Sequence, residues 1–120
     1  MRSRLLAWQW SDYSAKHRNR GNLLLHIVVV PLFQLGTLAL IYGAVAGGVG
    51  VAVLGMVAMV VSIVVQGRGH GREREAPTPF SGAADVVTRL LVEQWVTFPR
   101  FVLSGGWYQN LRLGQACRST

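Results

Sequence analysis

The sequence predicts an all-α integral membrane protein, built on a helical hairpin with amphipathic helices flanking it at the membrane surface. Between Leu23 and Val65 there is no Asp, Glu, Lys or Arg. A hydrocarbon core about 30 Å thick takes roughly 20 helical residues at 1.5 Å each, so this segment can cross a bilayer twice. Gly47, Gly48 and Gly50 lie near its centre. We therefore expect the chain to turn there and return.

Composition and charge agree with this fold class. The chain has 120 residues, of which 51% are hydrophobic, and its mean hydropathy is +0.34. Its 12 basic and 5 acidic residues could suggest nucleic acid, but the basic residues flank the apolar segment and do not form one stripe. We therefore expect no nucleic-acid binding. By the positive-inside rule, both termini are expected on the cytoplasmic side.

We expect a single membrane domain over residues 1–120. Its predicted parts are an interfacial helix over 2–18, membrane-spanning helices over 23–46 and 49–66, a polar loop over 67–80, an amphipathic helix over 82–104, and a loosely ordered tail over 105–120. Whether residues 82–104 span the membrane or lie in the interface stays open, as does the oligomeric state. The single cysteine, Cys117, lies in the tail and has no partner for an internal disulfide.

The three histidines of the chain all fall on the predicted cytoplasmic side. His26 precedes Gly48 by the same number of residues by which His70 follows it, so the hairpin should return both imidazoles to one membrane face. We expect these two rings within about 8 Å of each other, close enough to share a metal ion. His17 should approach the same point from the interfacial helix. Histidines near an interface are also often solvated bystanders, and the sequence leaves that alternative open.

Imidazole binds iron, zinc, copper and nickel, while two histidines with one carboxylate indicate an oxygen-activating Fe(II) site. Three carboxylates on the same side are candidates for the further ligand: Asp12, Glu73 and Glu75. Asn22 lies one turn before His26 and Gln66 one turn before His70, from where an amide could orient each ring. Asn22 could equally serve as a helix N-cap, and Gln66 as a polar group at the interface.

Two sequence blocks carry a resemblance to a known family. The first is Tyr13-x3-His17-x4-Asn22-x3-His26-x4-Pro31, and the second is Gln66-x2-Gly69-His70 with a proline-rich exit through Pro77 and Pro79-Phe80. In this order, in a chain with matching apolar segments, they resemble the membrane 2-hydroxy-fatty-acid dioxygenases that convert phytosphingosine to odd-numbered fatty acids. That family has a glutamate four residues after the Gly-His histidine, and a one-residue deletion aligns Glu73 with it.

The resemblance implies an Fe(II) site held by His17, His26, His70 and Glu73, with Tyr13, Asn22 and Gln66 around it. It also implies an oxidoreductase that uses molecular oxygen to shorten a 2-hydroxy fatty acid, or a related lipid, by one carbon in α-oxidation. The fourth ligand stays open among Glu73, Glu75, Asp12 and none. The alternative is a non-catalytic structural or interaction protein of the membrane.

Overall fold

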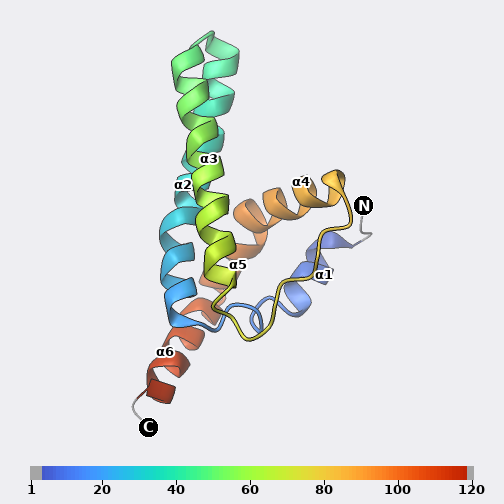
Figure 1. Cartoon of the computed structure of the whole chain (residues 1–120), viewed down its shortest axis with the longest axis vertical. Helices are drawn as coiled ribbons and strands as arrows, with labels where there is room; N and C mark the ends of the chain where they lie inside the picture. The colour runs from blue at the N-terminus through green and yellow to red at the C-terminus, as the bar shows by residue number, and fades with distance from the viewer. Residues whose placement is uncertain (1–3, 119–120) are drawn as a thin grey trace.

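The computed structural model describes residues 4–118, with side chains described through residue 114 (Figure 1). Every regular element in this part of the chain is helical. In order, these are α1 (Leu5–Ser11), α2 (Arg20–Ala46), α3 (Val49–His70), α4 (Ala83–Val92), the π-helix η1 (Glu93–Thr97), α5 (Phe98–Leu103) and α6 (Gly106–Arg118). The hairpin of α2 and α3 is the longest part of the structure, with α1, α4 and α5 to one side of its lower half and α6 below its foot. The predicted all-α class is confirmed.

The hairpin turns at Gly47 and Gly48, as the sequence predicts. Gly47 has φ +74°, a left-handed conformation that glycine adopts without steric cost. The two helices approach so closely that only glycine fits at some positions. A Cβ atom at Gly55 would lie 2.5 Å from the Gly36 carbonyl oxygen, and one at Gly43 would lie 2.5 Å from the Ala52 nitrogen, both too close for a real contact. The two helices therefore pack closely through glycine, as small residues allow in membrane helices.

Both α2 and α3 are long and apolar enough to cross a membrane, judged by length and composition. Only 28% of the most apolar window of α2 and 17% of that of α3 is buried. Large apolar side chains consequently face outward along the hairpin, among them Val28, Leu35, Leu38, Ile41, Val45, Val53, Leu54 and Val57. A core helix of a soluble protein is buried on more of its surface than this.

The helix boundaries differ from the sequence prediction at both feet of the hairpin. α2 begins at Arg20, capped by the Asn19 side chain, which accepts a hydrogen bond from the Asn22 backbone nitrogen at 3.0 Å. The N-cap is thus Asn19 and not Asn22. α3 continues to His70, past the predicted end at residue 66. In place of one helix over 2–18, α1 ends at Ser11 and turns follow it.

The predicted helix over 82–104 consists of α4, η1 and α5. Pro99 contributes to this interruption, because it has no N–H to donate to the preceding turn. The predicted loose tail is helix α6 through Arg118, and residues 119–120 lie outside the described part. α6 is held against the foot of the hairpin, because Trp107 Nε1 donates to the Leu23 carbonyl at 2.9 Å and Asn110 Nδ2 to the His17 carbonyl at 2.9 Å.

The hydrophobic core lies at this foot. Its buried members are Tyr13, Leu23, Val30, Phe98 and Phe101. They come from the turn after α1, from α2 and from α5, so the core joins the short helices to the hairpin. The candidate site lies beside it.

Candidate metal centre

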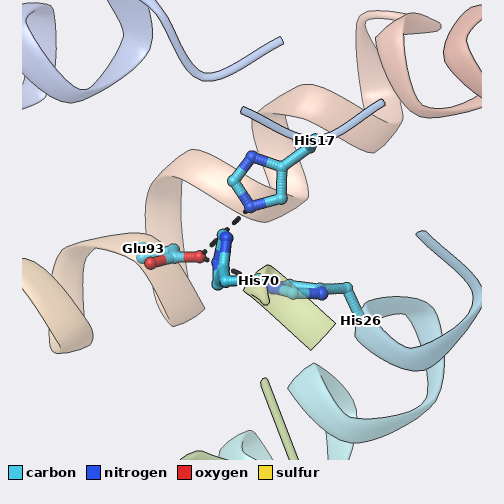
Figure 2. Close-up of side chains that lie close together, drawn as sticks. All are labelled: His17, His26, His70 and Glu93. Atoms are coloured by element: carbon cyan, nitrogen blue, oxygen red, sulfur yellow. Dashed lines mark ion pairs between the residues drawn. The ribbon is translucent and has the colours of Figure 1, made fainter. Parts of the chain in front are cut away.

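Three histidines and one glutamate converge at the foot of the hairpin (Figure 2). His17 lies between α1 and α2, His26 in the second turn of α2, His70 at the end of α3, and Glu93 at the start of η1. Each offers one ligand atom, and these atoms all lie within 4.8 Å of one another. The structure thus brings the three predicted histidines together, with a carboxylate, Glu93, that was not among the predicted ligand candidates.

Backbone carbonyls fix the orientation of two of the imidazoles. His17 Nδ1 donates to the Tyr13 carbonyl at 2.8 Å, and His26 Nδ1 donates to the Asn22 carbonyl at 2.9 Å. A carbonyl oxygen only accepts, so Nδ1 carries the proton in each ring and the Nε2 lone pair is free. Metal-ligating histidines commonly have this arrangement. The contact to His26 comes from the Asn22 backbone carbonyl and not from the predicted side-chain amide, whose Nδ2 donates to Glu73.

The free nitrogens are buried and unpaired. His17 Nε2, His26 Nε2 and His70 Nδ1 are inaccessible to solvent and have no hydrogen-bond partner among the described residues. His26 itself is 0% exposed. Leaving a buried polar atom unpaired costs about 1–3 kcal/mol, so three in one cluster call for a ligand. A metal ion would satisfy all three at once.

The distances are close to those of a coordination shell. Two nitrogens that bind one metal ion at about 2.0–2.2 Å lie no more than about 4.4 Å apart. The candidate ligand atoms lie within 4.8 Å of one another, so the most distant pair would move together by a few tenths of an ångström when an ion binds. The His26 and His70 ring centroids are 5.1 Å apart, and those of His17 and His70 are 4.7 Å apart. The predicted close approach of His26 and His70 is confirmed.

Glu93 faces the histidines through one oxygen. Its Oε1 lies 3.7 Å from His17 Nε2 and 3.9 Å from His26 Nε2, and it accepts a hydrogen bond from the Tyr13 hydroxyl at 3.2 Å. Burial raises the pKa of Glu93, but the positive charge that His17, and after it His26 and His70, carries when protonated outweighs burial and lowers that pKa to about 2. A metal cation bound to the unprotonated histidines would supply positive charge at the same place, so Glu93 would meet it as an ionised carboxylate.

Tyr13 holds this oxygen in place. Its ring stacks on His17 with centroids 3.9 Å apart, and it is 4% exposed. Burial, followed by the charge of Glu93 and the hydrogen bond to it, raises the pKa of Tyr13 well above its usual value. The hydroxyl therefore keeps its proton and donates a hydrogen bond to Glu93. Tyr13 thus lies beside the cluster, in the place the resemblance implies.

A network of amides positions η1. Gln66 and Gln94 exchange two side-chain hydrogen bonds of 2.8 Å each, and Gln34 Nε2 donates to the Gln94 carbonyl at 2.7 Å. Gln66 also donates to Ser62 at 2.9 Å. Gln66 thus fixes the segment that carries Glu93, and its described hydrogen bonds do not include one to His70. The wider turn of the π-helix lets neighbouring residues serve the site and the network.

Glu73, the carboxylate implied by the family resemblance, has a different role here. Its oxygens accept hydrogen bonds from the backbone nitrogens of Arg18 at 2.8 Å and Asn19 at 2.9 Å, and from Asn22 Nδ2 at 2.6 Å. It therefore closes the loop after α3 onto the start of α2. In the described part of the chain, the cluster that could hold a metal ion contains Glu93 and not Glu73.

The other two candidate carboxylates also lie outside this cluster. Asp12 forms an ion pair with Lys16 at 2.9 Å, and Glu75 is exposed. Sequence reasoning misses Glu93 because its spacing from Arg89 suggests an exposed i,i+4 pair. Arg89 instead faces Asp85 at 3.4 Å. A signal is present, since Glu93 and Gln94 are adjacent polar residues between two apolar stretches, residues 90–92 and 95–96.

No family model, curated protein or solved structure matches the chain.

The chemistry of this site therefore has to be read from its donor atoms. The site offers three imidazole nitrogens and one carboxylate oxygen, without sulfur, and could hold a metal ion. Such a donor set suits iron, zinc, copper or nickel.

A pocket of about 50 Å³ opens onto this site. Its wall includes three of the four clustered side chains, His17, His70 and Glu93. The remainder of the wall comes from α1, α4, the turn after α1 and the loop after α3: Trp8, Gln9, Asp12, Tyr13, Lys16, Pro77, Thr78 and Arg89. A space of this volume has room for a few water-sized molecules beside the site.

Proposed function

We propose that α2 and α3 span a membrane and that the metal centre lies at its cytoplasmic face. Exposed apolar side chains along the hairpin and its uncharged Gly47–Gly48 turn support the insertion. The basic residues at the foot, Arg18, Arg20, Arg68, Arg72 and Arg74, favour the cytoplasm for that end. Both termini would share that side.

We further propose that the cluster holds Fe(II) and that the protein is a membrane dioxygenase acting on 2-hydroxy fatty acids or a related lipid. The observation that carries the metal site is the convergence of three unpaired, buried imidazole nitrogens and a carboxylate within 4.8 Å. The choice of iron rests on a histidine and carboxylate donor set without thiolate, and on the resemblance of the two histidine blocks. When bound, Fe(II) would supply the redox chemistry that activates molecular oxygen.

In the proposed reaction, one 2-hydroxy acid and one O2 give an acid one carbon shorter, CO2 and water. The carbon–carbon bond between the carboxylate and the hydroxyl-bearing carbon breaks, that carbon becomes the new carboxyl carbon, and O2 is fully reduced. The atoms and electrons balance without a further reductant. Such an enzyme needs side chains that hold the metal ion and a pocket beside them that binds the carboxylate of the substrate.

The chain's own residues would do the following. His17 and His26 keep their Nδ1 protons on backbone carbonyls, so each Nε2 stays available as a ligand. Tyr13 holds Glu93 Oε1 by its hydroxyl and keeps the carboxylate aimed at the histidines. The pocket beside them contains Lys16, whose ammonium contacts Asp12 and Thr78 at 2.9 Å each, as a cation for a substrate carboxylate.

The test is oxygen uptake by detergent-purified protein loaded anaerobically with Fe(II). We expect uptake with a long-chain 2-hydroxy acid, and none with the matching 3-hydroxy or unsubstituted acid. His26→Ala should abolish uptake while leaving membrane insertion intact. Iron-loaded protein that consumes no oxygen with any 2-hydroxy acyl chain would favour the non-catalytic alternative.

A further inference from the structure

A second and larger pocket lies at the foot of the hairpin. It is a partly open pocket of about 1080 Å³, close to the upper end of the volumes of ligand-binding pockets. The start of α2, the loop after α3 and α6 form its wall, which contains Ala15, Arg18, Asn19, Arg20, Gly21, Leu24, Arg72, Glu73, Arg74, Glu75, Asn110, Leu113 and Gly114. Nothing in the proposed reaction uses this space.

Four arginines line this pocket: Arg18, Arg20, Arg72 and Arg74. Within the described part of the chain, none of their guanidinium groups has a hydrogen bond or an ion pair, and the Arg20 Nε atom is buried without a partner. The Arg72 guanidinium lies over Gly21, since a Cβ there would be 2.7 Å from Nη1. The pocket thus gathers unpaired cations.

Two glutamates in the wall do not neutralise these cations. The Glu73 carboxylate is occupied by the backbone nitrogens of Arg18 and Asn19 and by the Asn22 amide. Glu75 is exposed and forms no described ion pair. Four positive and two negative groups leave an excess of two positive charges facing the pocket. Arginine is the side chain best suited to bind phosphate, because its guanidinium can donate two hydrogen bonds at once.

The wall also has an apolar part. Leu24 on α2 is 44% exposed and Leu113 on α6 is 63% exposed. In α2, Leu24 follows Arg20 by one turn, toward the apolar length of the hairpin. A ligand here would therefore meet arginines at one end and leucines beside them. A phospholipid with an anionic head group has this distribution of charge and apolar surface.

We propose that this pocket binds the phosphate of an anionic phospholipid, with the acyl chains beside Leu24 and Leu113. The lipid phosphate would pair with arginines of the wall, offset part of their excess positive charge, and tie α6 and the loop after α3 to the start of α2. The inference rests on the proposed membrane insertion, but not on iron or on catalysis. It can be tested on metal-free protein in detergent.

The experiment measures binding of dioctanoyl phosphatidylglycerol by native mass spectrometry or calorimetry, with dioctanoyl phosphatidylcholine and inorganic phosphate as comparison ligands. We expect the anionic lipid to bind more tightly than both. Arg20→Gln combined with Arg72→Gln should weaken its binding roughly 10- to 30-fold. The charge-matched control is Arg4→Gln combined with Arg68→Gln, because both residues are exposed and neither lines this pocket. It should change binding less than about twofold.

Three results would overturn the proposal: equal binding of the two lipids, unchanged binding by the double variant, or inorganic phosphate binding as tightly as the lipid. Circular dichroism of the double variant confirms that it is folded. Failure of membrane insertion is detected separately, by carbonate extraction of the wild-type protein, so it is not confused with failure of the lipid site. Oxygen uptake plays no part in the readout.

Discussion

His26 and His70, which lie equally far along the chain on either side of Gly48, meet with ring centroids 5.1 Å apart and planes at 86°. Each ring presents a buried nitrogen without a partner, His26 Nε2 and His70 Nδ1. Because the two histidines are equally distant from the turn, the hairpin brings them to the same place at its foot. Glu93 and His17 complete that site from outside the hairpin.

Tyr13 is predicted to be a positioning residue for Glu93. Tyr13→Phe keeps the ring that stacks on His17 but removes the hydroxyl that donates to Glu93 Oε1. We expect the affinity for metal to fall roughly 10- to 100-fold, as when a partner of a ligand is lost. Competition with a chromogenic chelator measures this affinity. Unchanged affinity would mean that Tyr13 serves packing alone.

Glu73 is predicted to act on stability and not on metal. Glu73→Gln replaces a carboxylate that accepts from the backbone nitrogens of Arg18 and Asn19. Weakening these charge-assisted bonds should lower the free energy of unfolding by about 1–3 kcal/mol, since hydrogen bonds to charged groups are worth roughly that much. Thermal unfolding in detergent checks the loss, and metal analysis should show an unchanged metal content. Metal loss comparable to that of a histidine variant would place Glu73 among the ligands.

The hairpin is predicted to depend on the contact between Gly55 and Gly36. Gly55→Ala puts a methyl group 2.5 Å from the Gly36 carbonyl oxygen, so the helices must separate. We expect a loss of about 1–3 kcal/mol, typical of overpacking. Gly50→Ala is the matched control on the same helix, because a Cβ at Gly50 has nothing within 4 Å. Equal effects of the two substitutions would contradict this packing.

The topology is predicted to put both termini in the cytoplasm. Gly48→Cys gives a probe at the turn, where a Cβ meets only ordinary contacts of 3.7 Å or more, whereas Gly47 has φ +74° and would be strained. In intact cells a membrane-impermeant maleimide should label this cysteine in a Cys117→Ser background. Native Cys117, whose side chain lies outside the described part, should react only after permeabilisation. The reverse labelling pattern would invert the arrangement.

The sequence predicts much of this fold because the hairpin is encoded locally. An uncharged apolar segment from Leu23 to Val65 and the central glycines determine two helices and their turn. The convergence of His26 and His70 follows from counting residues along helices of constant rise. His17 could be assigned to the same face, since it lies shortly before the first span.

Glu93 could not be found in this way, because its position depends on tertiary contacts. Its segment is a π-helix that the Gln66–Gln94 amide pair and the Gln34 hydrogen bond hold against the hairpin. Neither helical periodicity nor charge spacing contains that information. The order of α6 is not predictable for the same reason, because it depends on Trp107 and Asn110 bonding to distant backbone carbonyls.

The central claim is that His17, His26, His70 and Glu93 hold one Fe(II) ion. Its most direct test is the iron content of anaerobically purified protein, measured by inductively coupled plasma mass spectrometry for wild type, Glu93→Gln and Glu75→Gln. Glu75 is the matched carboxylate control, because it is exposed and outside the cluster. We predict about one iron per chain in wild type and in Glu75→Gln, and a loss of most of it in Glu93→Gln. Wild-type protein without iron, or Glu93→Gln with a full complement, would contradict the assignment.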